Sequence, residues 1–308
     1  MLSPDPKWPS AASLLVRGGA LDASSHTVVR LLGAHTHATS VSPRSESSTP
    51  AAVRAALARY STWSFEDRRD LADAAVIDDL GDVSAPDTDE GAAELAQLLG
   101  RDLEGPWLLL GGDNALTWRA LSALSRGRFE DWGLITFDAH LDMREGRSNG
   151  SPVRQLLDAG LDGSRVVQIG LADFSNSAAY ARDAAAAGVR VITRAQLRDR
   201  SLADVVREAV AVAGRDGRRV YVDVDMDVCD RSAVPGCPAA APGGVSPDEL
   251  RQLVRLTCAH AQVAALDITE IDVARDAPDE RTVRLAALVV LEAVAGFLRR
   301  TTNQRSAE

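Results

Sequence analysis

The chain has 308 residues, 45% of them hydrophobic, and a formal net charge of −10 at pH 7. That length suffices for one large α/β domain or two modest ones. Nucleic-acid binding needs clustered Lys and Arg, and a membrane span needs about 20 consecutive apolar residues, neither of which the sequence contains. We therefore expect a protein that binds neither nucleic acid nor membranes.

In chain order, residues 1–10 come first; they show no secretory signal and predict a loose tail of a cytoplasmic protein. Eight short runs rich in Val, Ile and Leu follow, at residues 27–34, 72–79, 106–113, 132–139, 165–172, 188–194, 218–225 and 262–269. Most of these runs do not alternate with polar residues, which is typical of strands buried on both faces of a parallel sheet.

Helical patterns separate the runs, at residues 49–60, 89–102, 201–214 and 246–260. Two of these patterns begin with an expected cap: Thr49 before a proline, and Ser246 with Glu249 three residues later. The alternation of strands and helices predicts an α/β fold with helices on both faces of a parallel sheet. No repeat or linker interrupts it, so we expect one domain over residues 11–300 and a loose tail over 301–308.

Four of the runs end in polar clusters, namely GGDN (111–114), DAHLD (138–142), DVDMDVCD (223–230) and DITEID (267–272). Ligands of parallel α/β sheets bind beyond the carboxyl ends of the strands, where these clusters lie. Alternate strand residues share a face, so Asp138 is expected to point with His140, and Asp225 with Asp227. Four converging carboxylates repel one another unless cations bind between them, and oxygen ligands with one imidazole suit Mn²⁺. Shared carboxylates further suit two metals about 3.5–4 Å apart.

Other chemically active side chains have simpler interpretations. We expect surface or structural roles for the remaining histidines, His26, His35, His37 and His260. Of these, His35 and His37 begin a long polar loop, residues 35–49, that opens at the same edge of the sheet. Three cysteines, Cys229, Cys237 and Cys258, cannot form a disulfide framework and lack a CxxC pair, so they are expected to pack in the core.

The order and wording of the polar clusters resemble the signature blocks of the ureohydrolases, the family of arginases, agmatinases and formimidoylglutamases. The resemblance covers roughly residues 28–300 and implies a three-layer α/β/α sandwich around a mostly parallel, eight-stranded sheet. It also implies two Mn²⁺ ions per chain and hydrolysis of a guanidino or formimino C–N bond by a hydroxide held between the metals. Relatives form trimers and hexamers, so a homo-oligomer is compatible with it, although no interface is recognisable in the sequence.

The same resemblance assigns roles to individual residues. The implied metal ligands are the bridging pair Asp138 and Asp225, the pair His140 and Asp227 at one metal, and Asp142 at the other. Asp142 is also implied as the group that transfers protons, and Glu270 as the acid that holds the cationic nitrogen of the substrate.

The sequence departs from the commonest family pattern in three places. Most ureohydrolases have a metal-binding histidine where this chain has Asn114, so we expect Asn114 to be a weak ligand of a loosely bound metal. Asp223 stands where many relatives have serine, and it is assigned no role. Residues 144–152 lack the histidine that many arginases use as a proton shuttle; Asn149 is the nearest match, which argues against an arginase.

Several arginines accompany these clusters in a chain of net negative charge. Arg144, Arg147 and Arg154 follow DAHLD, on either side of Asn149, and Arg44 lies in the first loop. Arginine pairs bidentately with carboxylates, so these arginines, together with Asn149, are expected to bind a substrate with two carboxylates. The alternative is that they are ordinary surface residues.

The wording of these segments is most similar to that of the formimidoylglutamase branch, which converts N-formimino-L-glutamate and water to L-glutamate and formamide in histidine degradation. That activity is the prediction. Two alternatives stay open: an agmatinase or guanidino-acid hydrolase that releases urea, and a metal-poor relative that binds an amino acid or a partner without turnover. Asn114 is the reason for keeping the last one.

Overall fold

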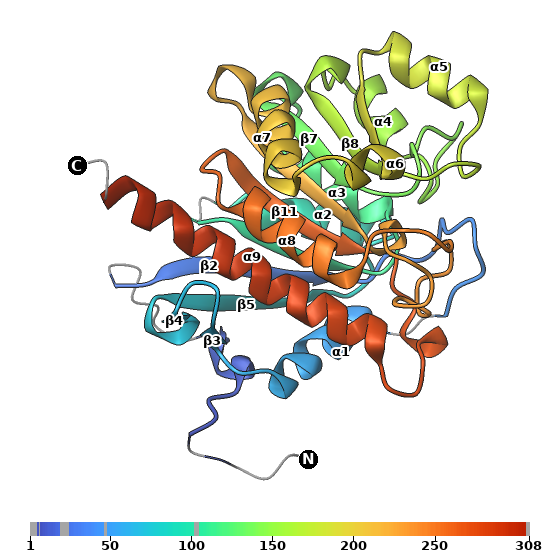
Figure 1. Ribbon diagram of the computed structural model, residues 1–308. Coiled ribbons are helices and arrows are strands. Elements are labelled where there is room, and N and C mark those ends of the chain that lie inside the picture. Colours follow the sequence, from blue (N-terminus) through green and yellow to red (C-terminus); the bar gives the residue numbers. More distant parts are fainter. Residues whose placement is uncertain (1–4, 6, 19–24, 46–47, 102–104, 306–308) are drawn as a thin grey trace.

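The computed structural model describes residues 5, 7–18, 25–45, 48–101 and 105–305, with only the backbone described for 301–305. It contains one large parallel sheet with helices on both faces (Figure 1). The expected three-layer α/β/α sandwich is therefore confirmed.

Within the described residues, the sheet has nine strands in the order β1-β5-β2-β6-β11-β10-β7-β8-β9, and all neighbouring strands are parallel. All eight expected strands are present: β2 (Thr27–Ala34), β5 (Ala75–Val83), β6 (Trp107–Gly111), β7 (Trp132–Phe137), β8 (Val166–Leu171), β9 (Arg190–Thr193), β10 (Arg219–Asp225) and β11 (Val263–Thr269). The predicted sheet of eight strands lacked one, the two-residue strand β1 (Leu15–Val16), which pairs with β5 at one edge. A separate antiparallel pair joins β3 (Trp63–Ser64) and β4 (Arg69–Asp70).

Two helical layers cover the sheet (Figure 1). One layer consists of α1 (Thr49–Ala56), α6 (Arg194–Arg198), α7 (Leu202–Ala213), α8 (Pro247–Cys258) and α9 (Arg281–Arg305). The other consists of α2 (Asp89–Leu99), α3 (Ala115–Ser125), α4 (Pro152–Asp158) and α5 (Ala178–Ala186). Each layer has its own apolar core against the sheet, so both faces of the central strands are dry.

Helix ends agree with the sequence in part. Ser246 and Glu249 form the expected capping box at the start of α8. At α1, the N-cap is Ser48; Thr49 is already helical, and its hydroxyl donates instead to the carbonyl of Ile271. The expected C-terminal tail is wrong for residues 301–305, because α9 continues to Arg305, while 306–308 lie outside the described residues.

The predicted N-terminal tail, residues 1–10, was also too long. Ser10 caps the short helix that follows it and pairs with Ser61, so the fold begins by residue 10. Of the earlier residues, 5 and 7–9 are described, and 1–4 and 6 lie outside the described part of the chain.

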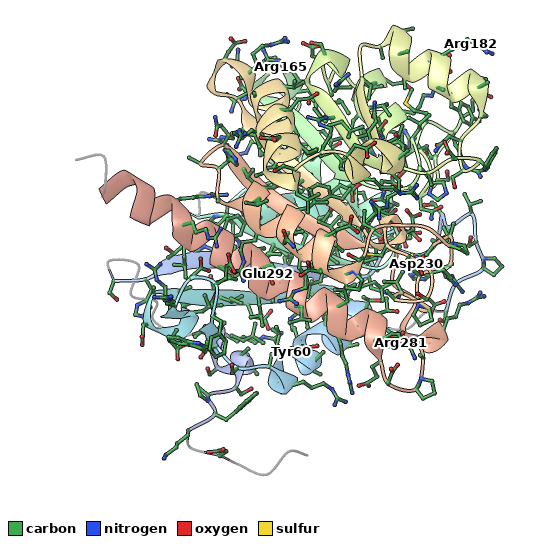
Figure 2. All side chains as sticks on the ribbon, viewed as in Figure 1. Tyr60, Arg165, Arg182, Asp230, Arg281 and Glu292 are labelled. Atoms are coloured by element: carbon green, nitrogen blue, oxygen red, sulfur yellow. The ribbon has the colours of Figure 1, made fainter. Side chains whose placement is uncertain are left out.

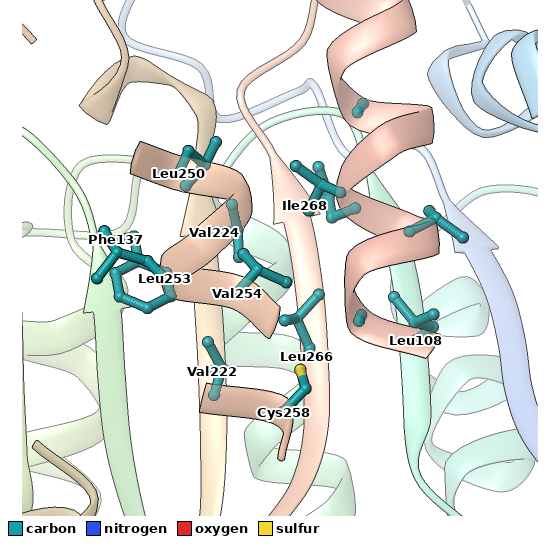
Figure 3. Close-up of a cluster of buried hydrophobic side chains, with 14 of the residues drawn as sticks. Leu108, Phe137, Val222, Val224, Leu250, Leu253, Val254, Cys258, Leu266 and Ile268 are labelled. Atoms are coloured by element: carbon teal, nitrogen blue, oxygen red, sulfur yellow. The ribbon is translucent and has the colours of Figure 1, made fainter. Parts of the chain in front are cut away.

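Figure 3 shows how α8 packs on the two central strands. Leu250, Leu253 and Val254 lie beside Val224 and Leu266 of these strands, and all five are 0% exposed. Burying each such side chain stabilises the fold by roughly 1.5–3 kcal/mol. The cysteines behave as expected: Cys258 belongs to this cluster, and all three thiols are free and buried.

One buried charge lies between α8 and α9. Figure 2 labels Glu292 on α9; it is 5% exposed, and its carboxylate accepts hydrogen bonds from Arg251 at 2.8 Å and from Arg255. This pairing satisfies a carboxylate that burial alone would destabilise. None of the helices in the described residues combines the length and apolarity needed to cross a membrane.

Candidate metal centre

The four central strands bring the polar clusters together. In the sheet, β6, β11, β10 and β7 are consecutive neighbours. Because they are parallel, the residues that follow them meet at one edge: Asn114 after β6, Glu270 after β11, Asp225 at the end of β10 and Asp138 after β7. This is the edge where a parallel α/β sheet binds its ligands.

Two groups of side chains at this edge can hold a cation. One is Asp138, His140 and Asp227, the other Asp138, Asp142 and Asp225, and within each group the ligand atoms lie within 4.8 Å of one another. These five are all the predicted metal ligands except Asn114. Asp138 belongs to both groups, as a bridging ligand should, whereas Asp225 belongs to one.

Backbone N–H groups hold these carboxylates in place. The amide of His140 donates to Asp138 Oδ1 at 2.6 Å, and that of Asp227 donates to Asp225 Oδ1 at 2.8 Å. Asp138 Oδ2 is buried and has no hydrogen-bond partner among the described residues. His140 Nδ1 lies 2.8 Å from Asp227 Oδ2, so a proton or a cation is required between them. An unpartnered buried oxygen within a carboxylate-rich donor set fits a divalent metal such as Mn²⁺.

The pKa values show how unfavourable this cluster is without a cation. Burial raises the pKa of Asp138 and Asp225 well above the usual range, and neighbouring carboxylates add to the effect. Burial likewise raises the pKa of Asp142 to about 8, although His140 and Asn114 act against it. Burial acts to lower the pKa of His140, but Asp227 outweighs it and raises that pKa to about 9. The metal-free site therefore retains protons that a bound metal would displace.

Two of the site residues have strained backbones. Asp142 has φ of 51° and Glu270 has φ of 61°, both in the left-handed region that non-glycine residues rarely occupy. Such conformations cost free energy and persist where the surrounding structure demands a particular side-chain direction. Here the strain turns both carboxyl groups toward the cavity that they line.

Asn114 does not present its carbonyl oxygen to the metal ligands, contrary to the expectation from sequence. Its side-chain amide donates to Asp142 Oδ2 at 2.7 Å and to Asp223 Oδ2 at 3.3 Å. Its Oδ1 instead lies 2.6 Å from the Thr117 hydroxyl and 3.1 Å from that of Thr269. The two carboxylates face the donor end of the amide, so Asn114 supports Asp142 and its carbonyl oxygen points away from the metal ligands.

Asp223, which had no assigned role, belongs to a buried network under the metal centre. It is the register partner of Asp267 across β10 and β11, and both are fully buried. Burial raises the pKa of Asp223 well above the usual range and that of Asp267 to about 6. Tyr221 donates to Asp267 at 2.7 Å. Sequence analysis gave no role to Asp267, the first residue of the DITEID cluster, or to Tyr221, which lies inside an apolar run.

A cavity of about 260 Å³ opens above the carboxylates. Of the predicted substrate-binding residues, Arg144 and Asn149 line it, and Arg147 and Arg154 do not. Arg147 is exposed. Arg154 is paired with Asp183 at 2.7 Å and donates to the carbonyl of Met143.

Glu270 is surrounded by donors from three segments. Its Oε1 accepts from the Asn114 amide N–H at 2.9 Å and from Asn149 Nδ2 at 2.8 Å. Its Oε2 lies 3.3 Å from Arg44 Nη1. Asn149 thus orients Glu270, and Arg44 is a neighbour of Glu270 and not a wall of the cavity.

The loop after β8 supplies residues that the sequence did not single out. Ser175, Asn176 and Ser177, with Tyr180 from the start of α5, line the cavity. Asn176 also braces the DAHLD segment: its Oδ1 accepts from the Leu141 N–H at 2.7 Å, and its Nδ2 donates to the Ala139 carbonyl at 3.0 Å. Their position after another parallel strand was the available signal.

His35 and His37 do not line this cavity. Their rings stack with centroids 5.4 Å apart and face a separate cavity of about 500 Å³, beside Asp82 and Asp87. The backbone amide of His37 donates to Asp87 Oδ2 at 2.7 Å. These contacts agree with the structural role expected for both histidines.

Residues 27–296 match the Arginase family, and the chain belongs to this family. It is 36% identical over 277 residues to formimidoylglutamase of Halalkalibacterium halodurans, which covers 86% of each chain. Its fold superposes on the crystal structure of Bacillus subtilis formimidoylglutamase with a TM-score of 0.88, at 30% identity over 97% of this chain and 94% of the other. Trypanosoma cruzi formiminoglutamase with Mn²⁺ shares the fold, with a TM-score of 0.83, 23% identity, and coverage of 95% and 99%.

Replacement of the shared carboxylate tests the metal centre. Asp138→Asn should reduce bound Mn²⁺ to one ion or none, because Asp138 belongs to both ligand groups. Asp225→Asn should weaken the group that it shares with Asp142. The number of Mn²⁺ ions bound at saturating Mn²⁺, from calorimetric titration of the metal-free proteins, gives the answer, with Asp230→Asn as the control, since Asp230 follows the same strand but belongs to neither group. Full Mn²⁺ occupancy in Asp138→Asn would contradict the assignment.

The raised pKa values predict how pH acts on the metal-free protein. The pKa of Asp142 rises from 3.8 to about 8 on folding, and that of His140 from 6.5 to about 9. The folded state thus holds protons that the unfolded chain releases, and this stability is lost as pH rises through both folded values. With EDTA present, Tm should fall from pH 6.5 to 9.

Bound Mn²⁺ requires the deprotonated ligands, so saturating Mn²⁺ should reduce or reverse that fall in Tm. Asp142→Asn removes one of the titrating groups and should show a shallower fall with EDTA. A metal-free protein whose Tm is constant or rises over this range would refute the explanation.

Proposed function

We propose that this protein is a Mn²⁺-dependent formimidoylglutamase of the cytoplasm, which hydrolyses N-formimino-L-glutamate to L-glutamate and formamide. The observation that carries the proposal is a single cavity in which the carboxylate cluster and the unpaired Arg144 meet. The relatives named above support the same reaction. A hydrolase that releases urea from a guanidino acid is the alternative outcome of the substrate test.

The residues of the chain suit this reaction. When bound, two Mn²⁺ ions would lower the pKa of water and supply a nucleophile near neutral pH. Glu270 faces the cavity and can accept an N–H of the amidine group. Asp142 lines the same cavity, and Asn114 orients it by donating to its Oδ2, which places this carboxylate where it can pass a proton to the departing nitrogen.

Recognition of the glutamate part falls to the rim of the cavity. Arg144 lines it, and within the described chain its guanidinium has no ion-pair partner, so it is available for a substrate carboxylate. Tyr180 and Ser175 also line the cavity and supply hydroxyl groups. Charge-assisted hydrogen bonds of this kind are the strong ones.

The structure separates the three arginines that the sequence grouped. Arg144→Ala should raise KM for formiminoglutamate roughly tenfold or more, because losing a charge-assisted pair costs about 1.5–3 kcal/mol. Arg147→Ala and Arg154→Ala should change KM little. Release of formamide, urea and ammonia from formiminoglutamate, agmatine and guanidino acids identifies the reaction. Urea as the main product, or a normal KM in Arg144→Ala, would contradict the proposal.

The metal beside Asn114 is proposed to bind more weakly than its partner. Asn114 donates to Asp142 and contributes no ligand atom, so Asp138, Asp142 and Asp225 alone remain for that ion. Dialysed protein should contain fewer than two Mn²⁺ per chain and regain activity when Mn²⁺ is added. Asn114→His adds an imidazole and should retain nearly two ions through the same dialysis. Equal, full occupancy in both proteins would refute weak binding.

A further inference from the structure

Arg44 does not occupy the position that a carboxylate-binding arginine needs. Its side chain is 3% exposed and does not line the cavity. Nη1 lies 3.3 Å from Glu270 Oε2, and Nη2 donates to the Gly112 carbonyl at 3.1 Å. The first loop thus places a buried guanidinium behind the carboxylate that faces the substrate.

This placement limits what Glu270 can still accept. A carboxylate has about four lone-pair positions for hydrogen bonds. Among the described residues, Asn114 and Asn149 occupy Oε1, and Arg44 occupies one position on Oε2. About one position therefore remains for a substrate in the cavity.

The two candidate substrate groups differ in the donors they present. The reacting carbon of a formimino group carries one terminal NH₂ and one C–H, whereas that of a guanidino group carries two terminal NH₂ groups. Both are cations near neutral pH, so charge alone does not separate them. The second NH₂ of a guanidino group needs a further acceptor, and a buried donor without one weakens binding.

We propose that Arg44 is a specificity-determining residue: it occupies one hydrogen-bonding position of Glu270, so that the site accepts a formimino group and rejects a guanidino group. The inference rests on the proposed function and deepens it. Arg44 acts through Glu270 and does not touch the substrate: it prevents the carboxylate from turning both oxygens toward two NH₂ groups at once. Asn149 and the Asn114 backbone complete the restraint from the other side.

The test uses two ligands that differ at the reacting carbon alone, N-formimino-L-glutamate and N-carbamimidoyl-L-glutamate. Wild-type holoenzyme should favour the formimino compound, in calorimetric affinity and in kcat/KM from formamide and urea release. Arg44→Met removes the guanidinium at similar length and should shift that preference toward the guanidino compound by roughly tenfold or more. Arg44→Lys keeps a cation beside Glu270 and should retain more of the wild-type preference.

Arg54→Met is the matched control. Arg54 is also a largely buried arginine, paired with Asp79 and Asp82 away from the cavity, and its loss should leave the preference unchanged. An unchanged preference in Arg44→Met, or an equal loss of both ligands, would show a purely structural role. If Arg44→Met does not fold, Arg44→Gln decides the question in the same way.

The proposed function and this inference can fail separately. If wild-type enzyme loaded with Mn²⁺ fails to hydrolyse the formimino compound, the proposed function is wrong. The ratio of the two calorimetric affinities in wild type and Arg44→Met still reports on Arg44 in that case. A ratio unaltered by the substitution would then refute the inference as well.

Discussion

The architecture of this protein depends on a group of carboxylates buried together without enough protein cations to neutralise them. Asp138, Asp142, Asp225 and Asp227 are each at most 7% exposed, and His140 is the one imidazole in their two ligand groups. Burial and mutual repulsion favour protonated forms of three of them, as the raised pKa values of Asp138, Asp142 and Asp225 show. A pair of divalent cations offsets both the free-energy cost of burying the carboxylates and their mutual repulsion, so the folded chain favours metal binding at this edge.

The surrounding structure holds these carboxylates in place. Four parallel strands end at one edge, and the dry cores on both faces of the sheet prevent the strands from shifting. Backbone amides of His140 and Asp227 orient the carboxylates, while Asn176 braces the DAHLD segment from a neighbouring loop. The left-handed backbones of Asp142 and Glu270 cost free energy that this packing supplies.

Neutral and cationic neighbours then divide the roles of the carboxylates. Asn114 donates to Asp142 and Asp223 and so joins the metal centre to the buried pair of Asp223 and Asp267. Arg44 neutralises Glu270, which distinguishes this acid from the metal ligands although all of them line one edge. One sheet edge can therefore carry a metal cluster and a substrate-binding acid side by side.

The sequence by itself determined the elements and the ligand types of this protein. Apolar runs predicted eight of the nine strands that the described residues form, because strand periodicity is a local property. The polar clusters at the strand ends predicted Asp138, His140, Asp225 and Asp227 as metal ligands, and the family resemblance added Asp142. The two-residue strand β1 is too short to show a period, and it exists through its pairing with β5.

Tertiary structure alone decided which groups are partners. In the structure, the side-chain amide of Asn114 donates a hydrogen bond to Asp142, Arg154 pairs with Asp183, and Arg44 lies behind Glu270. Asp267 and Tyr221 stand in apolar runs, and only the register of β10 against β11 reveals their network. Hydrogen bonds and ion pairs between distant segments depend on distance and direction in space, which the order of residues along the chain does not contain.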